Sequence, residues 1–247
     1  MKTAIVTGAA AGIGAACAKR LAADGLAVGV LDLDEARCAA IVDAIRADGG
    51  TAVALGADIS KRAQVREAVA NCREALGPVT VLVNNAAVTD FTPFDEVTDE
   101  LWDHVYAVNV RGTFVVTQEV LPDMRAAGWG RIINISSSGA QTGNPGMAAY
   151  SSSKGAVITL TRSLAQELGP FGITVNNIPP GSIMGTIMAE ENRSRFVIPV
   201  DTLIANMPVR RLGEPDDIAG ACSWLCQEAS SYITGQSIGV NGGRVVS

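Results

Sequence analysis

The sequence predicts an α/β fold in which a doubly wound parallel sheet of about seven strands carries helices on both faces. Short apolar runs alternate with longer amphipathic stretches along almost all of the 247 residues, which is the pattern of strands joined by crossover helices. Several runs are apolar at successive positions rather than at every second one, as expected for parallel strands that are covered on both faces.

Seven runs are the expected strands: Thr3–Thr7, Ala27–Leu31, Thr51–Leu55, Val79–Val83, Arg131–Ile135, Ile173–Ile178 and Gln236–Val240. Six stretches are the expected helices: Gly12–Asp24, Glu35–Asp48, Lys61–Leu76, Asp99–Ala127, Ala149–Leu168 and Pro215–Glu228. Because no linker or repeat separates these elements, we expect a single domain over residues 1–247. Residues 182–207 lack a clean period, and an irregular stretch of this length in a compact domain is usually a lid or a binding loop.

Composition excludes several classes of function. The net charge is −6 and no stripe of Lys and Arg is present, which argues against a nucleic-acid partner. Five scattered cysteines and one histidine predict neither a disulfide framework nor a metal site. No apolar run is long enough to span a membrane and no signal peptide is evident, so we expect a cytoplasmic protein. The 48% hydrophobic content suggests additional apolar area buried between subunits.

A glycine-rich turn, with Gly8, Gly12 and Gly14, follows the first expected strand and opens the first helix. Small residues let the backbone approach a pyrophosphate, and the helix N-terminus offers unpaired N–H groups and the positive end of its dipole. The spacing differs from GxGxxG. Taken alone, the turn could be a tight connection between a strand and a helix.

Asp32 ends the second expected strand, where a carboxylate can bind the adenosine ribose 2′-OH of a dinucleotide. Neither Leu33 nor Ala11 offers a cation, so a 2′-phosphate would meet a carboxylate without a counter-charge, which is strongly unfavourable. The pattern therefore favours NAD over NADP as the cofactor. The alternative interpretation is that Asp32 only ends the strand and caps the next helix.

Tyr150 and Lys154 lie four residues apart on an expected helix and therefore share one face. The pKa of a free phenol is about 10. A neighbouring ammonium group lowers a phenol pKa, and general acid–base catalysis works best when the pKa of the group approaches the ambient pH. The pair predicts a tyrosine that exchanges a proton with a hydroxyl or carbonyl oxygen. In isolation, the same spacing also occurs in ordinary surface pairs.

These features together resemble the short-chain dehydrogenase/reductase family, and the resemblance extends from Thr3 nearly to the C-terminus. It implies a Rossmann fold and an NAD-linked oxidoreductase that moves a hydride between the nicotinamide ring and a secondary alcohol or ketone carbon. The motifs that carry it are TGAAAGIG (Thr7–Gly14), Asp58, NNAA (Asn84–Ala87), Asn109, INISS (Ile133–Ser137), Tyr150-x-x-x-Lys154, PPG (Pro179–Gly181) and YITGQ (Tyr232–Gln236).

The resemblance implies a catalytic set of Asn109, Ser137, Tyr150 and Lys154. Ser137 would hydrogen-bond the substrate oxygen, and its choice over Ser136 and Ser138 rests on the resemblance alone. Asn109 would distort its helix and hold a water molecule beside Lys154, which would also bind the nicotinamide ribose.

The resemblance also implies contacts to the dinucleotide and the substrate. Asp58 and Ile59 would flank the adenine. The full cofactor set is Gly8, Ala11, Gly12, Ile13, Gly14, Asp32, Leu33, Asp58, Ile59, Asn85, Ala86, Tyr150, Lys154, Pro180, Gly181 and Ile183. The substrate contacts are Ser137, Tyr150, Met184 and Met188, and the apolar character of this wall favours an uncharged alcohol or ketone. Two positions depart from the family pattern. Ala87 stands where the family usually has the glycine of NNAG. Gly185 stands where the family usually has a threonine, and Thr186 is the next residue.

Two other functions remain open. A 3-ketoacyl-thioester reductase of the same family has almost the same motifs, although such enzymes commonly prefer NADP and have a basic patch for an acidic carrier. A dinucleotide-sensing protein without turnover would keep the fold, although such proteins typically lack the tyrosine or the lysine. The long helices and the last expected strand resemble surfaces through which this family forms homotetramers.

Overall fold

The structure, a computed structural model, describes residues 1–186 and 199–246. Its centre is a parallel sheet with the strand order β3-β2-β1-β4-β5-β6. The sheet has six strands rather than the expected seven: β1 (Thr3–Thr7), β2 (Ala27–Asp32), β3 (Thr51–Gly56), β4 (Val79–Asn84), β5 (Gly130–Ile135) and β6 (Ile173–Ile178). Every residue of β1, β5 and β6 is buried, as expected for parallel strands that are covered on both faces.

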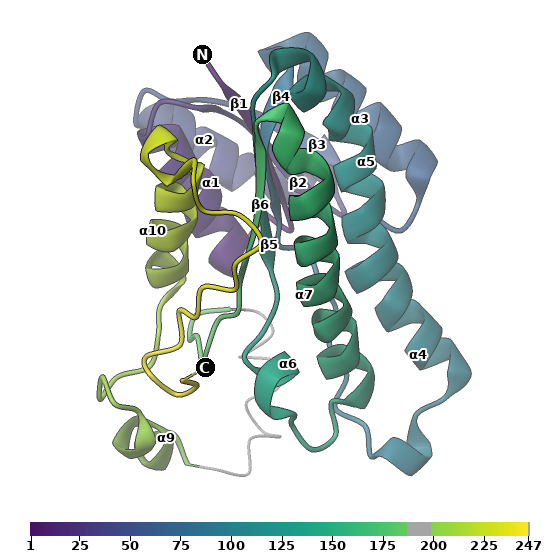
Figure 1. Cartoon of the computed structure of the whole chain (residues 1–247), viewed down its shortest axis with the longest axis vertical. Coiled ribbons are helices and arrows are strands. Elements are labelled where there is room, and N and C mark those ends of the chain that lie inside the picture. Colours follow the sequence, from purple (N-terminus) through teal and green to yellow (C-terminus); the bar gives the residue numbers. More distant parts are fainter. Residues whose placement is uncertain (187–198, 247) are drawn as a thin grey trace.

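Helices cover both faces of the sheet, and Figure 1 shows α1, α2 and α10 on one side and α3, α4, α5 and α7 on the other. Each layer of helices encloses a separate apolar cluster against its own face of the sheet. The fold is therefore the doubly wound one that the sequence predicts. The α-helices are α1 (Gly12–Ala23), α2 (Ala39–Ala47), α3 (Arg62–Leu76), α4 (Asp99–Tyr106), α5 (Thr113–Ala127), α6 (Gly139–Thr142), α7 (Ala148–Leu168), α9 (Val200–Asn206) and α10 (Pro215–Cys226).

The expected seventh strand, Gln236–Val240, lies beside β6 without forming a regular ladder. It makes only isolated parallel bridges, from Ser237 to Asn177 and from Val240 to Pro180. Proline has no N–H to donate, so two consecutive prolines after Ile178 interrupt the hydrogen bonding that a regular strand would need.

Two expected helices are interrupted. The stretch Asp99–Ala127 forms α4 and α5 with a π-helical turn between them, η3 (Ala107–Gly112). The stretch Glu35–Asp48 begins with a 3₁₀ turn, η1 (Glu35–Cys38), because the Asp34 side chain accepts a hydrogen bond from the N–H of Ala36 and starts a tighter turn. Within the described part of the chain, further 3₁₀ turns are η2 (Phe94–Glu96), η4 (Gly169–Phe171) and η6 (Glu228–Ser230).

The expected lid, residues 182–207, is only partly within the described residues. α9 lies in its second half, and residues 187–198 lie outside the described part of the chain. The strand order reverses direction between β1 and β4, and a ligand crevice forms at such a point, beyond the carboxyl ends of the strands.

Candidate active site

A cleft of about 990 Å³ lies at this reversal point. Its wall extends from Asp32 at the end of β2 to Tyr150 and Lys154 on α7. A volume of this size is at the upper end of the range for pockets that bind small molecules or cofactors.

The glycine turn forms one part of the wall and is shaped for close approach. Gly8 and Gly12 have positive φ angles of 63° and 55°, which favour glycine. A Cβ atom on Gly14 would lie 2.2 Å from the carbonyl oxygen of Gly8. Ala11 occupies the cap position of α1, and among the described residues no capping hydrogen bond from its side chain is present there. N–H groups of the first turn are therefore open to an anion. These features fit the pyrophosphate of a dinucleotide.

Asn85 holds this turn in place from the end of β4. Its side-chain amide donates to the carbonyl oxygens of Thr7 and Gly8, at 3.0 and 3.1 Å. In return, the Thr7 hydroxyl accepts hydrogen bonds from the backbone N–H groups of Asn85 and Ala86. The Asn85 side-chain amide therefore holds the turn in place, and Asn85 also lines the cleft.

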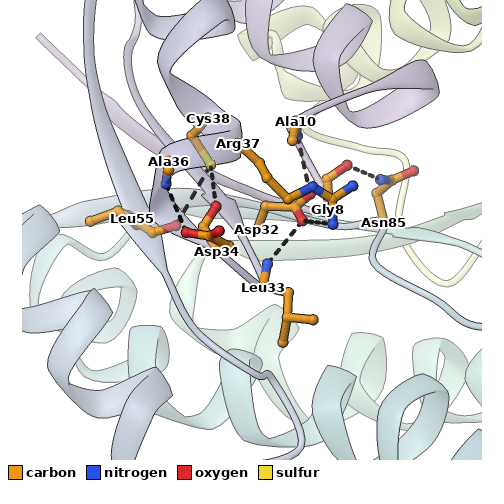
Figure 2. Close-up of polar contacts among 10 residues, drawn as sticks. All are labelled: Gly8, Ala10, Asp32, Leu33, Asp34, Ala36, Arg37, Cys38, Leu55 and Asn85. Atoms are coloured by element: carbon orange, nitrogen blue, oxygen red, sulfur yellow. Dashed lines mark hydrogen bonds and ion pairs between the residues drawn. The ribbon is translucent and has the colours of Figure 1, made fainter.

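Asp32 is bound by the backbone around it, as Figure 2 shows. Its carboxylate accepts from the N–H groups of Ala10 and Leu33, at 3.2 and 2.9 Å. Arg37 Nη1 lies 3.2 Å from Asp32 Oδ1 and also lines the cleft. The expectation that no counter-charge lies near Asp32 is therefore wrong. The turn η1 brings a cation to Asp32 from five positions further along the chain. The positions considered in the sequence, Leu33 and Ala11, carry no charge.

At the other end of the cleft, Tyr150 and Lys154 are buried, with exposed fractions of 7% and 3%. Ser137 lines the same cleft as Tyr150, and its hydroxyl accepts from the N–H of Gly139 at 3.0 Å. Lys154 Nζ lies 5.8 Å from the centre of the Tyr150 ring and donates to the carbonyl oxygen of Ile135 at 2.8 Å. The three polar side chains expected to act together in catalysis thus line the same part of the structure.

Burial dominates the protonation of this pair. It raises the pKa of the Tyr150 phenol above its usual value, and the hydrogen bond from Ser137 opposes the rise. Burial also lowers the pKa of Lys154 to about 8. The protein's own groups therefore do not give the depressed phenol pKa that the sequence argument expects, because desolvation penalises the charged form of both side chains.

Asn109 lies behind the wall, in the π-helical turn. Its side chain pairs with the backbone of Val88, accepting from the N–H and donating to the carbonyl, both at 2.9 Å. It also donates to Ser153 on α7 at 3.0 Å. Asn109 thus joins α7 to the segment that follows β4.

Comparison with known proteins places this arrangement in a family. The model of the short chain dehydrogenase family matches residues 2–196. The chain is 42% identical to the short-chain reductase protein NovJ of Streptomyces niveus, over 98% of this chain and 93% of the relative. It is 37% identical to the 3-oxoacyl-[acyl-carrier-protein] reductase FabG of Staphylococcus epidermidis, over 98% of each chain. It is 33% identical to 2-(S)-hydroxypropyl-CoM dehydrogenase 3 of Xanthobacter autotrophicus, over 96% of this chain and 94% of the relative.

The chain belongs to the short-chain dehydrogenase family. A short-chain dehydrogenase is an oxidoreductase and typically binds a nicotinamide dinucleotide, and the glycine turn and Asp32 fit such a cofactor.

The structure of this short-chain dehydrogenase brings most of the expected site residues to one cleft. All of the expected cofactor residues except Gly14 line it, as do Ser137 and Met184. Gly14 is buried under the glycine turn, and Asn109 lies behind the wall. Met188 lies outside the described residues.

Three residues near this site were not predicted from the sequence. Arg37 and Arg244 line the cleft, and Arg244 donates to the Ser182 hydroxyl at 2.7 Å. Asp90 binds the backbone of Tyr150. No local motif marks any of the three, because each reaches the site through the tertiary fold.

Among residues 1–186 and 199–246, no group of three or more His, Cys, Asp or Glu side chains could hold a metal ion. In that same part of the chain, no helix combines the length and apolar character needed to cross a membrane. All five cysteines are free and buried.

Proposed function

We propose that this short-chain dehydrogenase transfers a hydride between NAD(H) and a secondary alcohol or ketone, with Tyr150 as the general acid and base. The observation that carries the proposal is that Ser137, the buried Tyr150 and Lys154 lie on the wall of the same cleft that contains the glycine turn and Asp32.

In the oxidative direction, Tyr150 takes the proton of the substrate hydroxyl as the carbinol carbon releases its hydride. A bound dinucleotide supplies the hydride acceptor and, when oxidised, a positive ring that favours the phenolate. Ser137 donates to the substrate oxygen and orients it toward the phenol. The products are the ketone, the reduced cofactor and protonated Tyr150, and the reverse sequence reduces a ketone.

Lys154 is proposed to assist the bound dinucleotide in stabilising the phenolate. Its ammonium lies one helical turn from Tyr150 and stabilises the negative charge that develops on the phenol oxygen. Asn109, through Ser153 and the backbone of Val88, holds α7 against the segment after β4. We further propose that Asn109 orders a water molecule that connects Lys154 to solvent.

We propose NAD as the preferred cofactor because Asp32 offers carboxylate oxygens at the expected position of the adenosine ribose. Arg37 weakens the discrimination against NADP, since its guanidinium partly neutralises that carboxylate. NAD preference therefore depends on the balance between these two side chains.

The substrate side of the cleft supports an uncharged substrate. Its described wall is mainly apolar and includes Val88, Phe91, Met147, Met184, Leu203 and Leu212. The second candidate is reduction of a 3-ketoacyl thioester, which the similarity to the 3-oxoacyl-[acyl-carrier-protein] reductase favours.

A single domain, a homotetramer and a cytoplasmic location complete the proposal. The free cysteines support the last of these, because thiols stay reduced in the cytosol.

The test is turnover of the purified protein, followed at the absorbance of reduced nicotinamide, with NAD or NADP and a panel of secondary alcohols. Ketones and an acetoacetyl thioester are assayed in the reverse direction. We expect turnover of secondary alcohols with a preference for NAD. Faster turnover of the thioester with NADPH would favour the second candidate. Dinucleotide binding without turnover of any compound would instead indicate a sensing protein.

A further inference from the structure

The helix that carries Tyr150 and Lys154 starts without a capping residue of its own. The residue at the cap position of α7 is Met147, and no side-chain capping bond is present there among the described residues. The first N–H groups of any helix lack partners within the helix. The start of α7 therefore needs an acceptor from another part of the chain.

Asp90, 60 positions earlier in sequence, provides this acceptor. The N–H of Tyr150 donates to Asp90 Oδ1 at 2.9 Å. Tyr150 is the third residue of α7, and its N–H is one that a capping side chain normally binds. A carboxylate at this position also interacts favourably with the positive end of the helix dipole.

Asp90 is buried more deeply than this capping role requires. Its exposed fraction is 4%, and Oδ2 has no hydrogen-bond partner within the described chain. A half-satisfied buried carboxylate is unfavourable for stability. A serine or asparagine could accept the same hydrogen bond without burying a charge. The position therefore fits a role in holding Tyr150 better than a role in stability alone.

The segment around Asp90 connects the substrate wall to α7. Val88 and Phe91, on either side of Asp90, line the cleft. Val88 is bound by Asn109, which also binds Ser153 on α7. The N–H of Thr92 donates to the carbonyl of Gly146, just before α7, at 2.8 Å. These hydrogen bonds join the segment to the first two turns of α7 on both sides of Tyr150.

We propose that Asp90 is a positioning residue, whose carboxylate caps α7 from a distant segment and sets the place of the Tyr150 phenol against Ser137 and the substrate. The proposal rests on the function proposed above. It predicts an effect on kcat, because the phenol acts in the chemical step, and little effect on dinucleotide binding, because Asp90 is not part of the wall that binds the dinucleotide.

The test compares Asp90→Ala, which removes the acceptor, with Asp90→Asn, which keeps one. We expect Asp90→Ala to lower kcat by roughly 10- to 100-fold, since a small misplacement of a reacting group has effects of this size. We expect Asp90→Asn to recover kcat to within about threefold of wild type, and the dissociation constant of NADH to change by less than about twofold in both variants.

Thr98→Ala is the matched control, because Thr98 caps α4 through the N–H of Leu101 at 3.2 Å. It removes an equivalent bond from a helix without Tyr150, and should lower Tm while leaving kcat unchanged. If Asp90→Ala does not fold, Asp90→Glu keeps the charge but displaces the acceptor. It should lower kcat while NADH binding shows that the protein is folded.

Unchanged kcat in whichever of Asp90→Ala and Asp90→Glu folds, with only a lower Tm, would overturn the proposal while the proposed function stands. Absence of turnover in the wild-type protein would overturn the proposed function, and this proposal with it.

Discussion

The two ends of the cleft are built in opposite ways. At the proposed adenosine end, Asp32 is held by backbone N–H groups from the glycine turn and from the next residue, and its partner Arg37 is half exposed. At the proposed hydride-transfer end, Ser137, Tyr150 and Lys154 come from two separate segments, and the tyrosine and lysine are almost completely buried.

This difference determines what each end can do. Exposed charges interact weakly because water screens them, so the adenosine end can select between similar cofactors by only small free-energy differences. Burial shifts the pKa of Tyr150 and Lys154 in opposite directions, so changes at the other end should have large effects on the rate. Substitutions at each end of the cleft test this contrast.

Gly14→Ala should disrupt the glycine turn, on which dinucleotide binding depends. The added methyl group would lie 2.2 Å from the Gly8 carbonyl and 2.6 Å from the Asn85 amide, so the turn must shift. We expect the dissociation constant of NADH to rise roughly 100-fold, or about 2.7 kcal/mol, as measured by titration calorimetry.

Gly220→Ala on α10 is the control for this change, since the added methyl group would meet no atom of the described chain within 4 Å apart from its chain neighbours and the backbone of its own helix. It should leave NADH binding unchanged and raise Tm slightly, because alanine is favoured over glycine in a helix by up to about 1 kcal/mol. Equal NADH affinity in both variants would show that the turn does not bind the dinucleotide.

Ketone reduction should lose activity as the pH rises. Burial lowers the pKa of Lys154 to about 8, so its ammonium loses a proton above that pH and no longer stabilises the phenolate that forms when Tyr150 donates its proton. We expect kcat/KM to fall by about tenfold per pH unit well above this pKa. A profile that stays flat to high pH, with Tm unchanged, would contradict this role of Lys154.

Asp32→Ala should change cofactor selectivity. Without the carboxylate, the 2′-OH of NAD loses an acceptor and the 2′-phosphate of NADP loses a repelling charge, while Arg37 remains. We expect the ratio of kcat/KM for NAD to that for NADP to fall by roughly tenfold, or about 1.4 kcal/mol.

Asp34 is the matched control for Asp32, because its carboxylate binds the N–H of Ala36 and it is not part of the cleft wall. Asp34→Ala should leave the NAD-to-NADP ratio as it is. A similar loss of NAD preference in both variants would mean that a general change in charge, rather than contact with the ribose, is responsible.

Arg37→Ala should have the smallest effect and the opposite sign. Removing the guanidinium leaves the Asp32 carboxylate without its counter-charge, which disfavours a 2′-phosphate more strongly. Arg37 is half exposed and water screens its charge, so the ion pair should contribute only about 1 kcal/mol. We therefore expect the NAD-to-NADP ratio to rise by a few fold. A fall in this ratio would show that Arg37 assists binding of NAD itself.

The same contrast explains how much could be predicted from the sequence. The doubly wound sheet was predictable because buried parallel strands are continuously apolar, and the glycine turn was predictable because its parts are contiguous. The prediction of a seventh strand was wrong because the apolar pattern of Gln236–Val240 does not show which segment would pair with it. Pro180, on the facing segment, prevents a regular ladder there.

The contacts that were missed depend on turns and distant segments. Arg37 reaches Asp32 because a 3₁₀ turn replaces the first turn of an expected α-helix. Asp90 lies in a segment without periodicity and meets Tyr150 only through the tertiary fold. The pKa directions also depend on burial, which a sequence pattern does not quantify.

The most direct test of the account is Tyr150→Phe, which removes the phenol oxygen and keeps the ring that packs in the cleft. We predict that kcat falls by roughly 100- to 10,000-fold, the usual contribution of a general acid or base, and that NADH binds as tightly as to the wild-type protein. Turnover at the wild-type rate in this variant would contradict the account.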